Sequence, residues 1–350
     1  MTVLPPTLPM KQKAAIYNSP GSVSIDIVET DIPEPGPDEV LINLTHSGVC
    51  HSDLDIMTNS WAGLPPTPQG QIGGHEGVGR VVKLGSGTGS SGIKIGDRVG
   101  VKWVASACGN CEPCQKQSDS LCFNQKVSGY YTPGTFQQYV LGPANYVTRI
   151  PDEVESAQVA PLLCAGLTAY SALKRSMTAP VQIASKGMGF RVIGIDQGQK
   201  AELVKNSGAE HFVDISQFPT DDNGVAISNL VKSLTGGLGP HTVIVCTAAN
   251  SAYSQGVQFL RFGGTLVCVG LPAGEQKPIA SASPGGLIAK QLKIMGSAVG
   301  NRVDAVEVLD LAARGVVHVH IQTVPMEGLS QIFQDMKAGS LMGRAVIDLS

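Results

Sequence analysis

The sequence predicts an α/β protein of two domains, in which a β-rich N-terminal part is followed by a doubly wound parallel sheet. Three observations lead to this prediction. The chain has 350 residues, which is more than one ordinary core uses. Its 42 glycines and 22 prolines have no collagen-like period and indicate many tight turns between short elements. After Gly166, strand-like and helix-like segments alternate, as in a parallel sheet that is covered by helices.

The composition excludes several classes of protein. Hydrophobic residues make up 42% and charged residues 15% of the chain, so it is too apolar to be disordered. The chain contains no run of about 18 apolar residues that would span a membrane. The net charge is −3 and no basic block occurs, which argues against nucleic acid as a partner. Because the first residues carry no secretory signal, we expect a soluble, cytoplasmic protein that acts on small molecules.

The elements of the second half follow from short β-branched runs that alternate with helix-like segments. The predicted strands are 191–196, 210–215, 242–247 and 265–270, and the predicted helices are 200–207, 225–235 and 253–261. A further helix is expected at 303–314 and a last strand at 341–349. Cys246 and Cys268 lie inside predicted strands, and we expect both to be small core residues without a metal role.

Four cysteines lie close together in the first half. Cys108, Cys111, Cys114 and Cys122 have the spacing C-x2-C-x2-C-x7-C, with Gly, Asn and Pro between them to turn the chain back. Four thiolates that leave no open position are the ligand set of a structural zinc ion. A cluster of reduced surface thiols and an iron–sulfur cluster are the alternatives.

A second set of metal-binding side chains is dispersed along the chain. Cys50, His75 and Cys164 provide two thiolates and one imidazole, which leave the fourth position of a tetrahedral zinc site open for water or substrate. Each residue alone also fits an ordinary turn or core position, so spacing alone does not decide between the two interpretations.

Several motifs together resemble the zinc-containing medium-chain alcohol dehydrogenases, and the yeast and fungal type fits best. These motifs are 48–53, 73–77, the four cysteines, 134–139 and 160–170. The resemblance implies a GroES-like catalytic domain at 1–165, a Rossmann-type NAD-binding domain at 166–300, and a return to the catalytic domain at 301–350. It also implies a homo-oligomer, either a tetramer or a dimer.

The resemblance implies a role for each residue around the dispersed set. Cys50, His75 and Cys164 match the ligands of a catalytic zinc ion, which would make two zinc ions per chain. Ser52 matches the hydroxyl that bonds the substrate oxygen and starts a proton relay, and His51 matches a position that meets cofactor phosphate. The substrate would be a small alcohol or aldehyde.

Two carboxylates and two tryptophans complete this set by resemblance. Asp53 matches a residue that orients a ligating imidazole, and Glu76 matches one that lies behind the metal, where it offsets charge or ligates transiently. Trp61 and Trp103 match aromatic residues that line a narrow substrate pocket, although core packing explains a tryptophan equally well. The family often has a histidine where this chain has Asp55, and a reference pKa of about 3.9 suits a neutral-pH relay poorly.

The cofactor half matches the family at four positions. Asp196 ends a predicted strand, where an acid hydrogen-bonds the adenosine ribose and favours NAD over NADP. Lys200 could assist at the ribose, but it falls one residue earlier than the usual spacing. Val269 matches a nicotinamide contact, and Arg344 matches a pyrophosphate contact.

The glycine-rich fingerprint that should precede Asp196 by about 20 residues is missing. No glycine occurs from Leu167 through Lys186, and 181–186 resembles a helix where a strand is required. Compared with the family pattern, about 15 to 17 residues are lacking, enough for the first strand and its phosphate loop. This deletion would leave two open strand edges and weaken NAD binding.

Three functional hypotheses remain. The preferred one is a zinc- and NAD-dependent alcohol dehydrogenase that transfers hydride reversibly between alcohol and NAD, with a segment missing from this sequence. The second is a zinc-binding homologue that no longer transfers hydride and acts as a regulatory partner or a lyase. The third is a binding module with structural zinc only, in which Cys50, His75 and Cys164 are unrelated.

Overall fold

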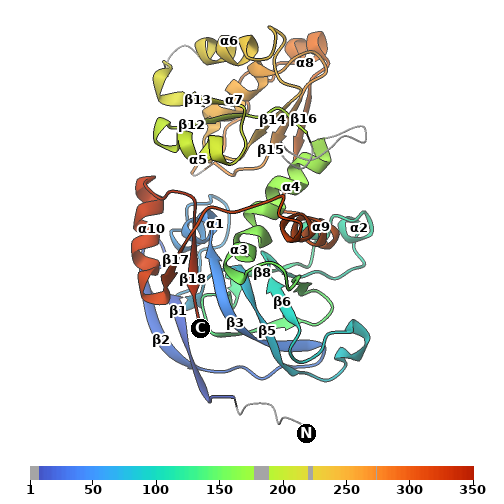
Figure 1. Ribbon diagram of the computed structural model, residues 1–350, viewed down its shortest axis with the longest axis vertical. Coiled ribbons are helices and arrows are strands. Elements are labelled where there is room, and N and C mark those ends of the chain that lie inside the picture. Colours follow the sequence, from blue (N-terminus) through green and yellow to red (C-terminus); the bar gives the residue numbers. More distant parts are fainter. Residues whose placement is uncertain (1–7, 177–188, 220–223, 273) are drawn as a thin grey trace. The chain divides into compact units, whose positions relative to one another are not determined.

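The computed structural model describes residues 8–176, 189–219, 224–272 and 274–350. Within them the chain forms two compact units (Figure 1). The first unit contains Met1–Leu167 and Val299–Ser350, and the second contains Thr168–Ala298. The chain thus begins and ends in the first unit.

The first unit is rich in strands that form three sheets. Its largest sheet has the order β11-β6-β5-β3-β18-β17, with β10 also paired to β3, and the smaller sheets are β2-β1-β4 and β7-β8-β9. The strands of this unit are β1 (Lys11–Tyr17), β2 (Ile25–Asp31), β3 (Glu39–Val49), β4 (Gln71–Ile72), β5 (Glu76–Leu84), β6 (Arg98–Val101), β7 (Val104–Ser106), β8 (Lys126–Ser128), β9 (Tyr131–Thr132), β10 (Tyr139–Pro143), β11 (Thr148–Arg149), β17 (Ile321–Pro325) and β18 (Arg344–Asp348).

Short helices connect these strands. The α-helices of the first unit are α1 (His51–Met57), α2 (Glu112–Gln115), α3 (Ser156–Val159), α9 (Arg302–Ala313) and α10 (Leu329–Ala338), and its 3-10 helices are η1 (Thr88–Ser91), η2 (Asp119–Leu121), η3 (Ala160–Leu163) and η7 (Met326–Gly328). Helix α4 (Ala165–Ser176) leads into the second unit. The helix predicted at 303–314 is α9, and the strand predicted at 341–349 is β18.

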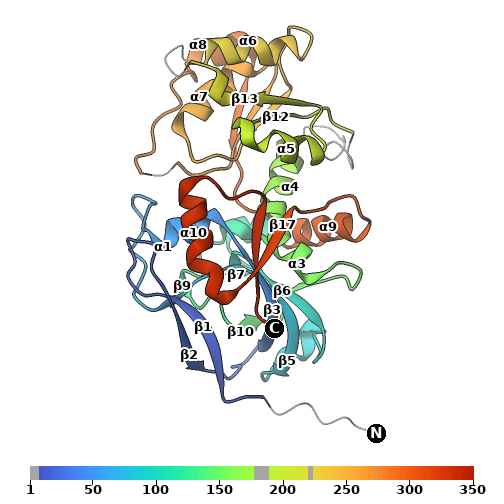
Figure 2. The same ribbon diagram turned by 60° about the vertical axis from the view of Figure 1, so that its left-hand side comes forward.

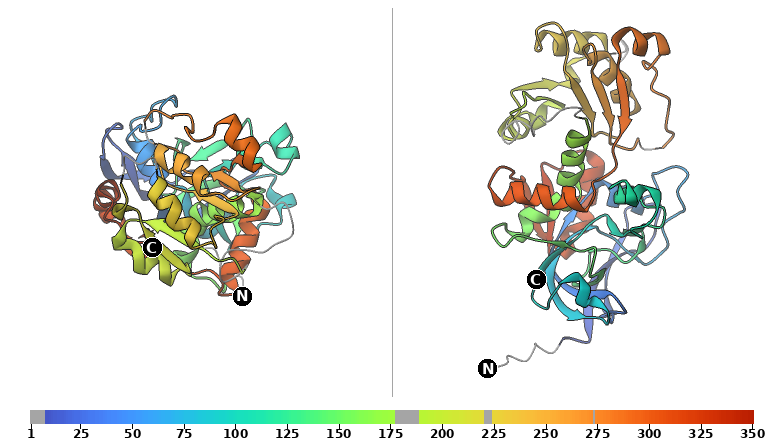
Figure 3. Two further views of the ribbon diagram at one scale, coloured as in Figure 1. Left: turned by 90° about the horizontal axis from the view of Figure 1, so that it is seen from above. Right: turned by 90° about the vertical axis from the view of Figure 1, so that its right-hand side faces the viewer.

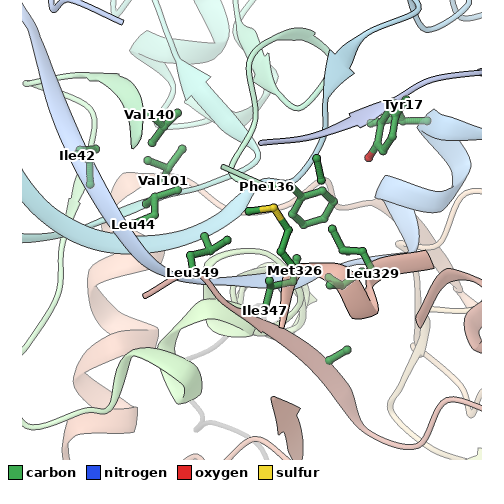
Figure 4. Close-up of a cluster of buried hydrophobic side chains, with 14 of the residues drawn as sticks. Tyr17, Ile42, Leu44, Val101, Phe136, Val140, Met326, Leu329, Ile347 and Leu349 are labelled. Atoms are coloured by element: carbon green, nitrogen blue, oxygen red, sulfur yellow. The ribbon is translucent and has the colours of Figure 1, made fainter. Parts of the chain in front are cut away.

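The C-terminal segment completes the core of the first unit. Strand β18 pairs antiparallel with β3 and places Val346 opposite Gly48. Helix α10 buries Leu329, Ile332 and Phe333, whose spacing of three and four residues puts them on one face of the helix. Figures 1 and 2 show α10 beside β17. In Figure 4, Leu329 lies with Phe136 among buried side chains from distant parts of the sequence.

The second unit contains parallel strands and helices, as the βαβ pattern predicts. Its strands are β12 (Ile193–Asp196), β13 (His211–Asp214), β14 (Thr242–Val245), β15 (Thr265–Cys268) and β16 (Lys293–Gly296), and its helices are α5 (Ala201–Asn206), α6 (Val225–Ser233), α7 (Asn250–Phe259) and α8 (Pro284–Lys290), with 3-10 turns η5 (Gly198–Lys200) and η6 (Ile215–Gln217). All pairings among these strands are parallel. The four strands predicted in this half are present, whereas the sequence analysis did not identify β16 or α8.

The sheet of the second unit is divided into two parts. Strands β12 and β13 form one part, and β14, β15 and β16 form the other, which the right-hand view of Figure 3 shows side by side. Among the described residues, no strand pairs with both β12 and β14. The apolar core is also divided into two clusters, and Val243 packs against both of them. The helix predicted at 181–186 lies outside the described residues.

The two cysteines of the second unit are less buried than the sequence suggested. Cys246 is exposed and Cys268 is half-buried. Strand β14 ends at Val245, so Cys246 lies in the segment that follows the strand. The prediction that both are core residues is therefore wrong for Cys246.

In the part of the chain that the structure describes, no single helix is long and apolar enough to cross a membrane. The bent pair 156–163 and 165–176 reaches that length and composition only together, with a bend of 51°. Its side chains Leu162, Leu163 and Leu167 are buried inside the first unit.

Candidate active site

Four buried side chains with metal-binding atoms meet in the first unit. Cys50, His75, Glu76 and Cys164 each offer one ligand atom, and these atoms lie within 4.8 Å of one another. The two sulfurs, Cys50 Sγ and Cys164 Sγ, are 3.9 Å apart. The structure thus brings together the dispersed residues that the sequence proposed as ligands of one ion. We call these four residues the buried cluster.

The local chain conformation places two members of the buried cluster. Cys50 follows β3 and is the N-cap of α1. Gly74, which precedes His75, has φ +90°, and a Cβ atom there would lie 2.6 Å from the Phe136 ring. Only glycine therefore fits at this position without strain or a shift of Phe136. Glycine at this position determines how the chain enters β5 and where the imidazole lies.

Asp53 connects Cys50 to His75. The Cys50 backbone N–H donates to Asp53 Oδ2 over 2.9 Å, and His75 Nδ1 lies 2.8 Å from Asp53 Oδ1. Because a carboxylate only accepts, Nδ1 carries a proton, and Nε2 is the nitrogen left to face the sulfurs. Burial lowers the pKa of His75, but Asp53 outweighs burial and raises this pKa well above its ordinary value.

A metal ion fits the buried cluster on chemical grounds. His75 Nε2 is buried and has no hydrogen-bond partner among the described residues. At zinc sites, a ligating histidine binds the metal through one ring nitrogen and donates its other ring N–H to a carboxylate. His75 has this arrangement, with its unpartnered Nε2 beside two thiols and its Nδ1 donating to Asp53. The hydrogen bond that the two thiols share lowers the pKa of Cys50 and raises that of Cys164, so one sulfur already favours the anion that zinc requires.

Glu76 is paired with an arginine from the opposite end of the chain. Arg344 Nη2 donates to both carboxylate oxygens, at 2.7 and 2.9 Å, although the two residues are 268 positions apart. Burial raises the pKa of Glu76 to about 7, and the charge of Arg344 opposes the rise. The family resemblance assigns Arg344 to cofactor pyrophosphate, and no local sequence pattern predicts its ion pair with Glu76, because nothing local connects the two positions.

The remaining predicted residues of α1 lie in its first turns. His51 is exposed and Ser52 is half-buried, and neither is part of the buried cluster. Asp55 is buried, and His51 Nε2 lies 3.9 Å from its Oδ1. Burial raises the pKa of Asp55, while His51 opposes the rise. The pKa of this carboxyl therefore lies above the reference value for aspartate.

Trp103 lies next to the imidazole, and Trp61 lies next to Trp103. The Trp103 and His75 ring centroids are 4.9 Å apart at an interplanar angle of 86°, and those of Trp61 and Trp103 are 6.0 Å apart at 71°. Such edge-on contacts are favourable for aromatic rings. We call Trp61 and Trp103 the tryptophan pair. The structure thus places Trp103 against a member of the buried cluster, and Trp61 against Trp103.

The four sequence-adjacent cysteines also converge. The sulfurs of Cys108, Cys111, Cys114 and Cys122 lie within 4.8 Å of one another, and the Cys111–Cys114 distance is 3.5 Å. Backbone N–H groups point at several of these sulfurs and lower the pKa of Cys108 to about 6. Four thiols of this kind, with N–H donors around them, fit a closed tetrahedral zinc site. We call residues 108–122 the four-cysteine lobe.

Three of the predicted cofactor residues, Asp196, Lys200 and Val269, lie in the second unit, at or just after the carboxyl ends of strands. Asp196 ends β12, and Val269 follows β15. Lys200 Nζ is 3.2 Å from Asp196 Oδ1, so the two residues that were expected near the ribose form an ion pair with each other. Carboxyl ends of parallel strands are where open α/β sheets bind nucleotides.

Comparisons with known proteins agree with this geometry. The family model of the alcohol dehydrogenase GroES-like domain matches residues 36–152, and that of the zinc-binding dehydrogenases matches 178–314. Alcohol dehydrogenase 2 of Emericella nidulans is 62% identical and alcohol dehydrogenase of Schizosaccharomyces pombe is 40% identical, each with at least 98% of both chains covered.

Solved structures have the same fold. Acetophenone reductase from Geotrichum candidum, in complex with NAD, gives a TM-score of 0.81 at 26% identity, with 98% of each chain covered. The alcohol dehydrogenase of the archaeon Aeropyrum pernix gives a TM-score of 0.82 at 25% identity, with 96% of this chain and 99% of that chain covered.

We predict that Asp53→Asn weakens metal binding at the buried cluster. The amide keeps the shape of the carboxylate but removes the charge that orients His75 and supports its basicity, and loss of such a partner costs about 10- to 100-fold in affinity. Chelator competition measures the change. Asp310→Asn, at an exposed position of α9, is the matched control and should leave the affinity unchanged. Equal affinities in the two variants would contradict the role of Asp53.

Proposed function

Since the chain belongs to the zinc-containing medium-chain alcohol dehydrogenases, we propose that its buried cluster is the metal site of a reversible alcohol dehydrogenase that uses NAD. The observation that supports this most strongly is the orphaned His75 Nε2, which faces two buried sulfurs. Cys50, His75 and Cys164 would hold zinc, which, when bound, favours loss of the alcohol proton and polarises a carbonyl. The full-length similarity to alcohol dehydrogenases favours hydride transfer over the inactive alternative.

The residues around the buried cluster support this chemistry. Arg344 neutralises Glu76 beside the sulfurs, so that no unpaired carboxylate competes for the metal. The tryptophan pair presents apolar surface next to His75, which favours a small apolar alcohol over a charged substrate. Ser52 would hold the alcohol proton.

His51 and Asp55 offer a route for that proton toward solvent. His51 Nε2 and Asp55 Oδ1 are 3.9 Å apart, so a proton would pass between the exposed imidazole and the buried carboxyl through one water molecule. Because burial brings the pKa of Asp55 closer to neutrality, we propose that Asp55 takes the place of the histidine that the family often has after this motif. A homotetrameric assembly and a cytoplasmic location stay predictions from the sequence.

We propose a second zinc ion in the four-cysteine lobe, so that the chain binds two. Elemental analysis of the purified protein should give two zinc ions per chain. Cys164→Ser should give one, because the hydroxyl that replaces the thiol is a poor zinc ligand, and so should Cys111→Ser. Cys246→Ser is the control, because Cys246 is exposed and outside both sets. Two zinc ions in Cys164→Ser would refute the catalytic site, and an unchanged Cys111→Ser would refute only the lobe site.

We also propose that this chain lacks the first strand and the phosphate-binding turn of the nucleotide unit. Three observations support the proposal. No described strand joins β12 to β14. Every residue of β12 is only half-buried, although inner strands of parallel sheets are normally buried on both faces. The alignment with the Emericella nidulans relative spans 364 positions, which exceeds the 350 residues of this chain by 14.

The missing segment should weaken NAD binding. Backbone N–H groups at a helix N-terminus normally hold the pyrophosphate, and each charge-assisted contact is worth about 1.5–3 kcal/mol. Losing two of them lowers the affinity by about 100-fold or more.

We therefore predict that inserting the relative's additional residues between α4 and β12 tightens NADH binding by at least about 100-fold, as measured by NADH fluorescence titration. The same insertion should raise alcohol-dependent NADH formation. An inserted segment of equal length made of glycine and serine is the matched control, because it restores length without a strand. If the original chain binds NADH as tightly as the restored one, the proposed deletion is wrong.

A further inference from the structure

Tyr146 lies at the centre of a buried polar network behind the four-cysteine lobe. Its hydroxyl donates to Asp119 Oδ2 over 2.6 Å. Asp119 lies in η2, between Cys114 and Cys122, so this contact holds the segment that supplies two of the four thiols. Both Tyr146 and Asp119 are buried, and a hydrogen bond to a buried carboxylate is among the stronger ones that proteins form.

The start of α9 holds the same segment from another direction. Arg302 Nε lies 4.0 Å from Asp119 Oδ2, and Arg302 Nη1 donates to the Asn145 carbonyl oxygen over 3.2 Å. Asn301 Nδ2 donates to the Gln117 carbonyl oxygen over 2.8 Å. The contacts of Asp119 with Tyr146 and Arg302, and that of Gln117 with Asn301, therefore hold the lobe against the rest of the first unit.

Lys102 connects Tyr146 to the strands next to the buried cluster. This lysine is only 3% exposed, its Nζ donates to the Tyr146 carbonyl oxygen over 2.9 Å, and Nζ lies 4.0 Å from the centroid of the Tyr146 ring. Burial lowers the pKa of Lys102 to about 7, and an amine buried in this way needs such partners, because an unpaired polar group is costly to bury. The position of Tyr146 therefore restrains Lys102.

Lys102 is followed directly by Trp103, whose ring contacts His75. The Ser128 backbone N–H donates to the Trp103 carbonyl oxygen over 2.9 Å and holds the backbone of this stretch. Lys102 is thus joined through one peptide bond to the residue whose ring contacts both the imidazole and Trp61.

We propose that Tyr146 is a positioning residue that couples the folded four-cysteine lobe, through Asp119 and Lys102, to Trp103 and the tryptophan pair. This inference rests on the proposed function in one respect, since it takes the lobe to be held together by its metal. When the lobe is folded, Asp119 holds the Tyr146 hydroxyl and Lys102 holds its carbonyl group. When the lobe opens, Asp119 leaves, and Tyr146 and Lys102 lose their fixed geometry.

The protein carries its own probe for this coupling. The chain contains two tryptophans, and both belong to the tryptophan pair. Intrinsic tryptophan emission thus reports the surroundings of this pair alone. The rate of zinc release to a chelator, measured in a Cys164→Ser background that should hold only the lobe zinc, reports the lobe. Neither measurement needs NAD, so both work whatever the cofactor affinity of the chain.

Tyr146→Phe tests the proposal, because it removes the hydroxyl and keeps the ring. We expect the tryptophan emission to shift to the red, and zinc release from the lobe to accelerate by about tenfold, as loss of one charge-assisted hydrogen bond allows. Tyr139→Phe is the matched control, because Tyr139 lies on β10 outside this network, and it should change neither readout. In a Cys111→Ser background, Tyr146→Phe should cause no additional shift.

Asp119→Asn provides a second variant if Tyr146→Phe does not fold, because it keeps the shape of the carboxylate and weakens the same bond. The proposal is overturned if both variants bind two zinc ions and show the emission of the Tyr139→Phe control. It is also overturned if Tyr146→Phe shifts the emission equally in the Cys111→Ser background. A wild-type content of one zinc ion that Cys111→Ser does not remove would instead refute the lobe metal on which the coupling depends.

Discussion

The Asp53 carboxylate is the contact on which the buried cluster depends. One of its oxygens accepts the backbone N–H of Cys50, and the other accepts His75 Nδ1. Asp53 is fully buried, so water cannot replace either bond. A single side chain thereby caps α1, fixes the tautomer of His75 and aims Nε2 at the sulfurs. The chemistry proposed for the cluster follows from this geometry, since zinc needs an unprotonated nitrogen and two thiolates at one point.

Charge compensation extends from this point across the first unit. Arg344 arrives on the C-terminal strand β18 and neutralises Glu76 next to the cluster. On another side, Lys102 and Asp119 are buried close to Tyr146. Burying charges in this way is costly unless each has a partner, so the partners must keep their positions for the unit to stay folded. Because Lys102 and Asp119 must keep their positions beside Tyr146, they connect the four-cysteine lobe to the tryptophan pair.

The strands of the second unit pair in parallel, but among the described residues they do not form one continuous sheet. Strands β12 and β14 each have a pairing partner on one side among the described residues, and Val243 belongs to both small cores. A parallel sheet gains its stability from burial on both faces and from unbroken pairing. Asp196 and Val269 nevertheless lie at the strand ends where a nucleotide is expected. If the phosphate-binding turn is absent, as we propose, its loss limits cofactor affinity more than the residues expected to recognise ribose and nicotinamide do.

Local patterns were sufficient for part of this description. Residue spacing predicted the set of four cysteines and the parallel strands around Asp196, because each feature depends on residues that are close in sequence. The convergence of Cys50, His75 and Cys164 was expected only from a family resemblance. The pairing of Glu76 with Arg344 and the network around Tyr146 could not be predicted, because they join segments that come together only when the C-terminal strand and α9 pack in the first unit. Burial in that packed state also sets the pKa values of Glu76 and Asp55, which residue type alone does not specify.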